Sequence, residues 1–101
     1  QRFKKLAPDQ RPTAFFCGTD SIAATLIVEL QCNGFSVPGD VEVIGFGDTY
    51  SSTITNPAIT TIGIDYEQAA ESILNMLICK AAGENVPSQT LPLKLIKRQS
   101  A

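Results

Sequence analysis

The stretch V-E-V-I-G-F-G at residues 41–47 decides the fold of this chain. β-Branched and aromatic residues dominate it and glycines punctuate its end, so the pattern predicts a buried strand that runs into a polar loop at residues 48–56. The turn Pro38-Gly39-Asp40 precedes this strand. In an open parallel α/β sheet, ligands bind beyond the carboxyl ends of the strands. We therefore expect the functional site among residues 47–53.

Three further segments have the character of strands. Residues 13–17 and 58–64 are short apolar runs rich in β-branched or aromatic side chains. Residues 90–96 alternate weakly between apolar and polar side chains. Because Pro92 has no N–H group to donate to a neighbouring strand, we expect this last strand at an edge of the sheet.

Two segments carry the apolar spacing of helices. Residues 21–33 and residues 66–82 repeat apolar side chains every three or four positions, and each run is followed by glycine. Thr19 or Asp20 is the predicted N-cap of the first of these helices, since a side-chain oxygen there can accept from unpaired backbone N–H groups. Residues 1–7 are typical of the last turns of another helix.

Together these elements predict an α/β fold with a mainly parallel sheet flanked by helices. Two complete helices leave one sheet face thinly covered, although parallel sheets need both faces buried. We expect the helix at residues 66–82 either to fold back onto the sheet or to dock on a neighbouring molecule. In the helix at residues 21–33, Ala24 and Val28 widen the apolar face, which fits a subunit contact and a thicker core face equally well.

Composition limits the possible classes of protein. A chain of 101 residues is one domain or part of one, and its first residue, Gln1, indicates a piece of a longer product. Apolar residues make up 44% and charged residues 18%, which argues against disorder and suggests that protein outside the chain covers part of its surface. The net charge is −2 and the sequence has no basic stripe, so we do not expect this segment to bind nucleic acid by itself.

Cysteine and histidine content argues against metal sites and several kinds of catalysis. The chain has three widely spaced cysteines and no histidine, so no Cys/His zinc site and no Cys/His or Ser/His catalytic pair can form. We expect three thiols in a reducing compartment, with no metal and no cofactor. The sequence also lacks a run long enough to span a membrane, a visible signal peptide, a dinucleotide-binding fingerprint, a P-loop and a nucleophile elbow. An enzyme is therefore not expected.

Three segments in order resemble LacI/GalR-type transcriptional regulators. They are R-P-T-A-F-F-C-G-T-D-S-I-A at residues 11–23, N-G-F-S-V-P-G-D-V-E-V-I-G-F-G-D at residues 33–48 and N-P-A-I-T-T-I at residues 56–62. The resemblance is to the C-terminal part of the effector-binding domain, and it implies a partial periplasmic-binding-protein-like (type I) fold. In that arrangement residues 9–61 belong to the C-terminal lobe, and residues 65–101 supply a helix and a strand that return to the N-terminal lobe.

The resemblance also implies which residues face a small-molecule effector in the cleft between the lobes. Asp20 and Asp48 match acidic positions of the family. Thr19 stands where the family often has Asn, Gly47 where it usually has an Asp that binds sugar or purine effectors, and Ile64 where some members have Gln. The pocket is thus less polar than in most of the family. A sugar or related metabolite is the effector that the family implies.

A homodimer is the assembly that the resemblance implies. In the family, the helix after the first motif and the loop after the second pair two C-terminal lobes about a two-fold axis. Operator DNA is bound only through an N-terminal domain that is absent from this chain. The residues expected in the dimer interface are Ile22, Ala23, Leu26, Ile27, Leu30, Tyr50, Ile54 and Thr55.

Two functions share this architecture. The first is a cytoplasmic transcriptional repressor whose effector shifts lobe closure and thereby DNA binding. The alternative is a fragment of a periplasmic sugar- or solute-binding protein of an uptake system. Unpaired cysteines and the V-P-G-D-V core at residues 37–41 favour the regulator. An upstream helix-turn-helix would decide for the regulator, and an upstream signal peptide for the uptake protein.

Overall fold

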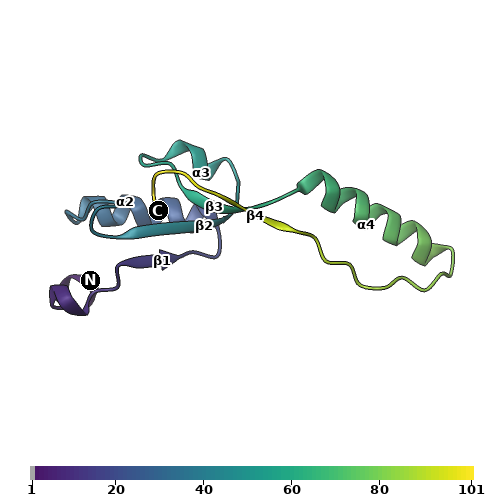
Figure 1. Ribbon diagram of the computed structural model, residues 1–101, viewed down its shortest axis with the longest axis horizontal. Helices are drawn as coiled ribbons and strands as arrows, with labels where there is room; N and C mark the ends of the chain where they lie inside the picture. Colours follow the sequence, from purple (N-terminus) through teal and green to yellow (C-terminus); the bar gives the residue numbers. More distant parts are fainter. Residues whose placement is uncertain (1) are drawn as a thin grey trace.

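The structure, a computed structural model, describes residues 2–101 and is elongated, with principal extents of 60 × 25 × 18 Å. Strands and helices alternate along most of the chain (Figure 1). The elements in order are α1 (Arg2–Lys5), the 3-10 helix η1 (Pro8–Gln10), β1 (Ala14–Phe16), α2 (Asp20–Cys32), β2 (Glu42–Gly47), α3 (Ser51–Ile54), β3 (Thr60–Ile64), α4 (Tyr66–Ala81) and β4 (Leu93–Ile96).

One four-stranded sheet with the order β1-β2-β3-β4 organises the chain. The first three strands are parallel, with Phe15 opposite Val43 and Ile44 opposite Thr60. The last strand is antiparallel to β3 and lies at the edge, as its proline predicted. The prediction of an α/β fold with a mainly parallel sheet is therefore confirmed.

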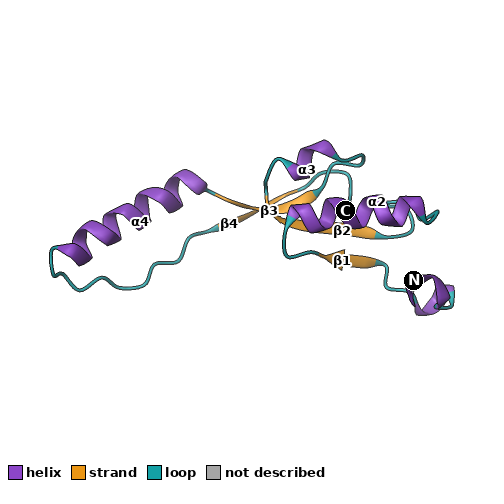
Figure 2. Ribbon diagram, turned by 180° about the vertical axis from the view of Figure 1, so that it is seen from behind, coloured by secondary structure: helices purple, strands orange, loops and turns teal. Residues whose placement is uncertain are grey.

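The hydrophobic core lies between α2 and one face of this sheet. The helix turns Ala23, Ile27 and Leu30 inward, onto Val43 of β2 and Ile59 before β3, and all five side chains are buried. This stripe has the 3.6-residue period of a helix with one face in contact. Figure 2 shows α2 lying along the sheet.

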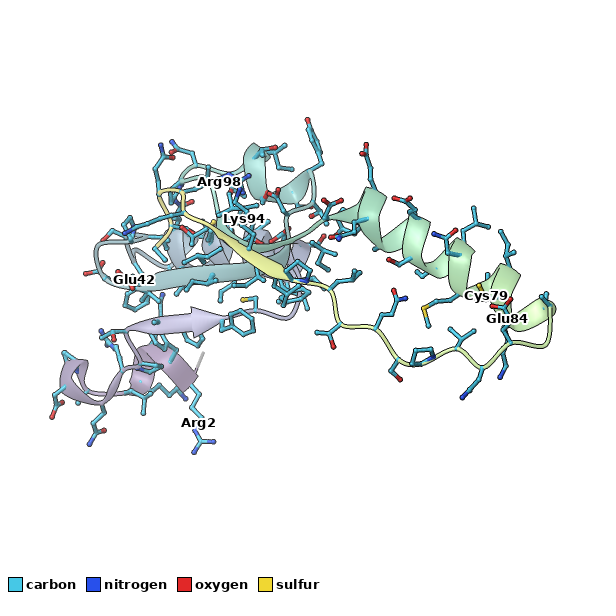
Figure 3. The ribbon with its side chains drawn as sticks, turned by 45° about the vertical axis from the view of Figure 1, so that its right-hand side comes forward. Arg2, Glu42, Cys79, Glu84, Lys94 and Arg98 are labelled. Carbon is cyan, nitrogen blue, oxygen red and sulfur yellow. The ribbon has the colours of Figure 1, made fainter. Side chains whose placement is uncertain are left out.

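The helix α4 lies apart from the sheet (Figures 1 and 2). None of its residues is buried, and its apolar side chains are mostly exposed, for example Leu77 at 63%. Figure 3 shows side chains surrounded by open space on this helix and on the extended segment that follows it, where Glu84 is labelled. The expectation that α4 folds back onto this sheet is therefore wrong, because β3 and β4 carry the chain away from the core before and after it. Docking on other protein stays a prediction.

The polar loop after β2 contains a short helix that the sequence pattern did not predict. In α3, Ser52 is fully buried while Ile54 is exposed. Hydroxyl groups hold its turn, since Ser52 Oγ donates to the Thr49 carbonyl oxygen at 2.7 Å and Thr53 Oγ1 donates to that of Tyr50 at 2.9 Å. Serine and threonine commonly make such local bonds to the backbone.

Candidate functional site

The parallel pairing of β1, β2 and β3 brings their carboxyl ends to one edge of the sheet. The segment at residues 17–20 follows β1, residues 48–50 follow β2, and Asp65 follows β3. A hydrogen bond from the Thr49 backbone N–H to Asp20 Oδ2, at 2.6 Å, joins the first two of these segments. The predicted site segments therefore meet, as expected for a ligand site in this class of fold.

Asp20 is a buried structural carboxylate. Its side chain has no exposed surface, Oδ1 accepts from Thr61 Oγ1 at 2.5 Å, and Oδ2 accepts from the N–H and hydroxyl of Thr49. A buried carboxylate requires such donors. Gly45 makes room for it, because a Cβ at that position would overlap Asp20 Oδ1. The prediction that Asp20 contacts an effector is corrected accordingly, since no surface of it is accessible.

Thr19 remains at the surface of this edge and caps α2. Its Oγ1 accepts from the Ile22 backbone N–H at 3.2 Å, so the threonine, and not the aspartate, is the N-cap. A capping oxygen of this kind stabilises the first turn of a helix.

Gly47 adopts a backbone conformation that suits glycine, with φ of +114°. Its carbonyl oxygen accepts from the Tyr66 hydroxyl at 2.6 Å, and a Cβ on Gly47 would lie 3.3 Å from that hydroxyl. The phenol of Tyr66 thus adjoins the space that the family's aspartate side chain would enter. Sequence reasoning missed Tyr66, although its position just after the carboxyl end of β3 was a usable signal.

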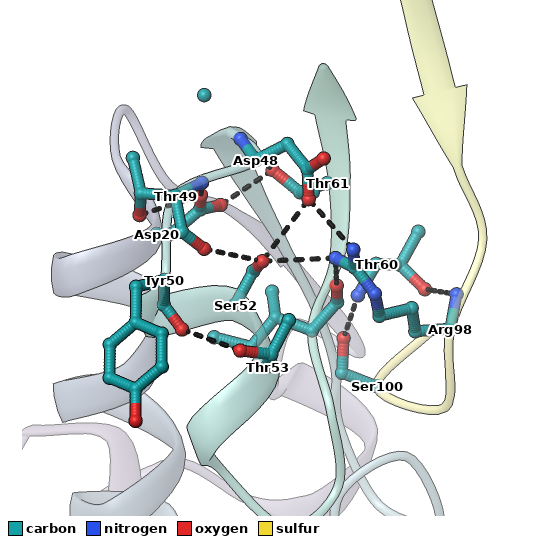
Figure 4. Close-up of polar contacts among 12 residues, drawn as sticks. Asp20, Asp48, Thr49, Tyr50, Ser52, Thr53, Thr60, Thr61, Arg98 and Ser100 are labelled. Atoms are coloured by element: carbon teal, nitrogen blue, oxygen red, sulfur yellow. Dashed lines mark hydrogen bonds and ion pairs between the residues drawn. The ribbon is translucent and has the colours of Figure 1, made fainter.

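Asp48 is held by an arginine from the far end of the chain. Its Oδ1 lies 2.7 Å from Nη2 of Arg98 in an ion pair whose side chains are 31% and 23% exposed, respectively. Figure 4 shows this pair beside Ser52. Within residues 2–101 no group donates to Asp48 Oδ2, which leaves this oxygen able to accept from a ligand. Arg98 was not predicted, because no local pattern links residues fifty positions apart.

A hollow lies where the chain leaves β3 for α4 and returns along β4. Its volume is about 390 Å³, within the size range of small-molecule sites. Asp48 and Ile64 both line it, whereas the other predicted effector residues do not. Its lining combines apolar side chains with the charged side chains of Asp48, Asp65 and Lys94. The remaining lining residues are Gly63, Gln68, Pro92 and Ile96.

The predicted dimer residues divide into two groups. Ala23, Ile27 and Leu30 pack in the core of this chain and are at most 6% exposed, so their assignment to a subunit interface is corrected. The reason is that they form the stripe of α2 that faces the sheet. Leu26 and Thr55 are half-buried. Ile22, Tyr50 and Ile54 are exposed and remain available for a partner.

Neither a metal site nor a membrane span is found in the described part of the chain. Residues 2–101 contain no cluster of three or more Cys, Asp or Glu side chains able to hold a metal ion. Among the same residues, no helix has both the length and the apolar character needed to cross a bilayer.

Sequence comparison identifies relatives along nearly the whole chain. A family model for the periplasmic binding protein-like domain matches residues 1–101. The HTH-type transcriptional repressor PurR of Erwinia tasmaniensis is 37% identical over 97 residues, and the NTD biosynthesis operon regulator NtdR of Bacillus subtilis is 38% identical over 93. The alignments cover 94% and 89% of this chain but only 28% of each relative, so the chain spans less than a third of their length.

Solved structures match the fold closely. A LacI regulator from Lactobacillus casei with bound Tris aligns over 99% of this chain and 35% of its own, with a TM-score of 0.82 and 32% identity. The lac repressor dimer bound to operator and the anti-inducer ONPF aligns over 88% of this chain and 32% of its own, with a TM-score of 0.81 and 30% identity. The Lactobacillus casei regulator with bound sucrose gives a TM-score of 0.81 at 30% identity, over 99% of this chain and 37% of its own.

Proposed function

Because this chain belongs to the periplasmic-binding-protein-like domain family and its relatives are LacI-type regulators, we propose that it is part of the effector-binding and dimerisation domain of a transcriptional repressor. In this proposal residues 9–61 lie in the C-terminal lobe, and residues 65–101 supply a helix and a strand to the N-terminal lobe. No residue of α4 is buried in this chain, which supports that division, since a helix with exposed apolar side chains needs a partner surface.

The hollow beside Asp48 is the proposed effector site. The proposal depends on one observation, that the Asp48 carboxylate lines this hollow. The unpaired Oδ2 accepts from a hydroxyl of the effector, and a charged acceptor makes such a bond stronger than a neutral one does. Ile64 offers apolar contact to the carbon skeleton of the ligand. Since Gly47 replaces an acidic residue of the family, Asp48 is the carboxylate that takes over recognition, while Asp65, which also lines the hollow, accepts from the Gln68 N–H through Oδ1. Relatives with bound sucrose and D-xylulofuranose support a sugar as the effector class.

A second copy of the chain is the proposed partner of the exposed face of α2 and α3. Ile22 and Ile54 are 57% and 58% exposed, and Tyr50 is 81% exposed. The hydroxyls of Ser21 and Ser51 lie 3.2 Å apart and join α2 to α3, so the two helices present their side chains together. An isologous contact of this face with itself closes a two-fold dimer. The dimeric form of the solved lac repressor supports this arrangement.

Effector binding between the lobes would act on DNA through lobe closure. An effector that contacts both lobes favours the arrangement in which those contacts form, and linkage requires that operator binding change in return. DNA is contacted by an N-terminal domain outside this chain, and the protein acts in the cytoplasm. The alternative, a solute-binding protein of an uptake system, shares the architecture, but the relatives with matching sequences are repressors. These relatives also argue against an enzyme.

The complete protein that contains this chain, called the parent regulator below, provides the test. We would measure its thermal unfolding and its binding to DNA from upstream of its own gene, with and without a panel of pentoses, hexoses and disaccharides that includes sucrose. A regulator is expected to bind the DNA, to gain thermal stability with one sugar, and to change DNA affinity in the presence of that sugar. Sugar binding without any DNA binding would support the uptake protein.

A further inference from the structure

The C-terminal tail folds back onto the sheet and is held at the start of β2 and β3. Ser100 is fully buried, its hydroxyl donates to the Val43 carbonyl oxygen, and the Thr60 N–H donates to that hydroxyl at 2.8 Å. The backbone N–H groups of Gln99 and Ser100 both donate to the Ala58 carbonyl oxygen. Independently of the Ser100 hydroxyl, the Arg98 backbone N–H donates to Thr60 Oγ1 at 2.9 Å and holds the backbone that carries this side chain (Figure 4).

From this fixed tail, Arg98 reaches three separate segments. Its Nη1 donates to the Ile59 carbonyl oxygen and to Ser52 Oγ, both at 3.0 Å, and its Nη2 donates to Asp48 Oδ1 at 2.7 Å. A planar guanidinium presents its donors in a fixed arrangement, so satisfying the first two acceptors sets the direction of the third bond. Figure 3 places Arg98 beyond Lys94 along the same C-terminal segment.

Apart from Arg98, few contacts orient the Asp48 side chain. Its backbone has φ of +50°, a left-handed conformation that is uncommon outside glycine. Ser52 Oγ lies 3.2 Å from Asp48 Oδ1 but 2.7 Å from the Thr49 carbonyl oxygen. A hydroxyl has one hydrogen, which the shorter contact takes. Arg98 is therefore the donor that orients the Asp48 carboxylate.

We propose that Arg98 is a positioning residue for the effector site, which fixes Asp48 Oδ1 so that Oδ2 is presented to a hydroxyl of the effector. This inference rests on the proposed function of the hollow beside Asp48. It assigns to the C-terminal tail a role in recognition, although the tail itself does not line that hollow. The competing explanation is that Arg98 only anchors the tail.

Two variants of the parent regulator separate these explanations. Arg98→Gln removes the guanidinium from Asp48, whereas Ser100→Ala removes tail contacts to Val43 and Thr60 and leaves Asp48 untouched. Hydrogen exchange followed by mass spectrometry, without any ligand, is the first measurement. We expect faster exchange at residues 47–53 in Arg98→Gln and wild-type exchange there in Ser100→Ala. Unchanged exchange at residues 47–53 in Arg98→Gln would overturn the proposal.

Sugar affinity is the second measurement, made by calorimetry with sucrose and any other sugar that stabilises the wild-type protein. Arg98→Gln should weaken binding by at least about tenfold, the effect of losing a hydrogen bond to a charged group. Ser100→Ala should bind like the wild type. Arg98→Lys keeps the charge but has one compact donor group, so its sugar affinity should lie between those of Arg98→Gln and the wild type. It replaces Arg98→Gln in this test if that variant does not fold.

A double-mutant cycle shows whether Arg98 acts through Asp48. In an Asp48→Asn background, Arg98→Gln should weaken sugar binding no further, because the carboxylate that it orients is gone. An equal loss in both backgrounds would overturn the proposal. If no sugar binds the wild-type protein, the proposed sugar function fails, while the exchange measurement still decides the role of Arg98.

Discussion

The Asp20 carboxylate and the Thr61 hydroxyl form a buried hydrogen bond of 2.5 Å that joins the start of α2 to β3. The same carboxylate binds the backbone and hydroxyl of Thr49 after β2. Three segments that follow or belong to different strands are thereby held at one edge of the sheet. This arrangement explains why an acidic residue stands at a position without solvent access.

Replacing Asp20 should be strongly destabilising. Asp20→Ala leaves the buried Thr61 hydroxyl without its acceptor and removes the acceptor of the Thr49 N–H, so we expect a loss of about 3 kcal/mol in the free energy of unfolding. Urea unfolding of the chain measures this loss. Asp9→Ala is the control, since Asp9 lies exposed in η1, and it should change stability little. Equal effects of the two variants would contradict a structural role for Asp20.

The close approach of Gly45 to Asp20 gives a second prediction. In Gly45→Ala the new Cβ would overlap Asp20 Oδ1 and lie 3.2 Å from Ile59 Cγ2, so we expect a loss of about 2 kcal/mol from overpacking. In the matched variant Gly18→Ala, the new Cβ meets nothing within 4 Å. The midpoint of urea unfolding should fall for the first variant only, and a similar midpoint for both would show that the strand can shift to make room.

Much of this architecture could be predicted from apolar periodicity. The strand at residues 41–47 and the helix at residues 21–33 are strongly patterned, and both are present within one or two residues. The short α3 was missed because hydroxyl bonds to the backbone, and not an apolar stripe, hold it. Helical spacing also cannot distinguish a core stripe from an interface stripe, which is why Ala23 and Ile27 were assigned to the dimer.

The site was harder to predict than the fold. Asp20 and Asp48 look alike in the sequence, but one is enclosed by three donor groups and the other lines the hollow. Only tertiary structure separates these roles. Arg98 and Tyr66 lie far in sequence from the groups they bind, Asp48 and Gly47, so no local motif pairs them with those groups.

Asp40 should make stability depend on acid pH. Its carboxylate accepts from the backbone N–H and the hydroxyl of Ser36, both at 2.8 Å, and these bonds hold the pKa of Asp40 below the ordinary 3.8. A pKa lowered by folding adds stability that is complete above pH 3.8 and is lost as the pH falls through the lowered value. As the pH is lowered from about 6 to about 2, the midpoint temperature of thermal unfolding should therefore fall less steeply for Asp40→Asn than for the wild-type protein. Parallel curves for the two proteins would contradict this prediction.

The exposed face of α2 and α3 should control assembly. Ile54→Asp in the parent regulator places a charge in the proposed two-fold contact, so we expect the dimer to dissociate at concentrations at least about tenfold higher than the wild type does. Gln10→Asp introduces the same charge on η1, away from this face, as the control. Sedimentation velocity over a concentration series measures both. A dimer unaffected by Ile54→Asp would place the interface elsewhere.

Sugar binding by the parent regulator and its Asp48→Ala variant, measured by isothermal titration calorimetry across the sugar panel, tests the central claim most directly. We expect the wild-type protein to bind at least one sugar and Asp48→Ala to bind it at least about tenfold more weakly, because a charged acceptor is lost. Asp9→Ala should bind as the wild type does. A sugar that binds Asp48→Ala and wild-type protein equally well, or no binding by any sugar, would contradict the assignment of this hollow as the effector site.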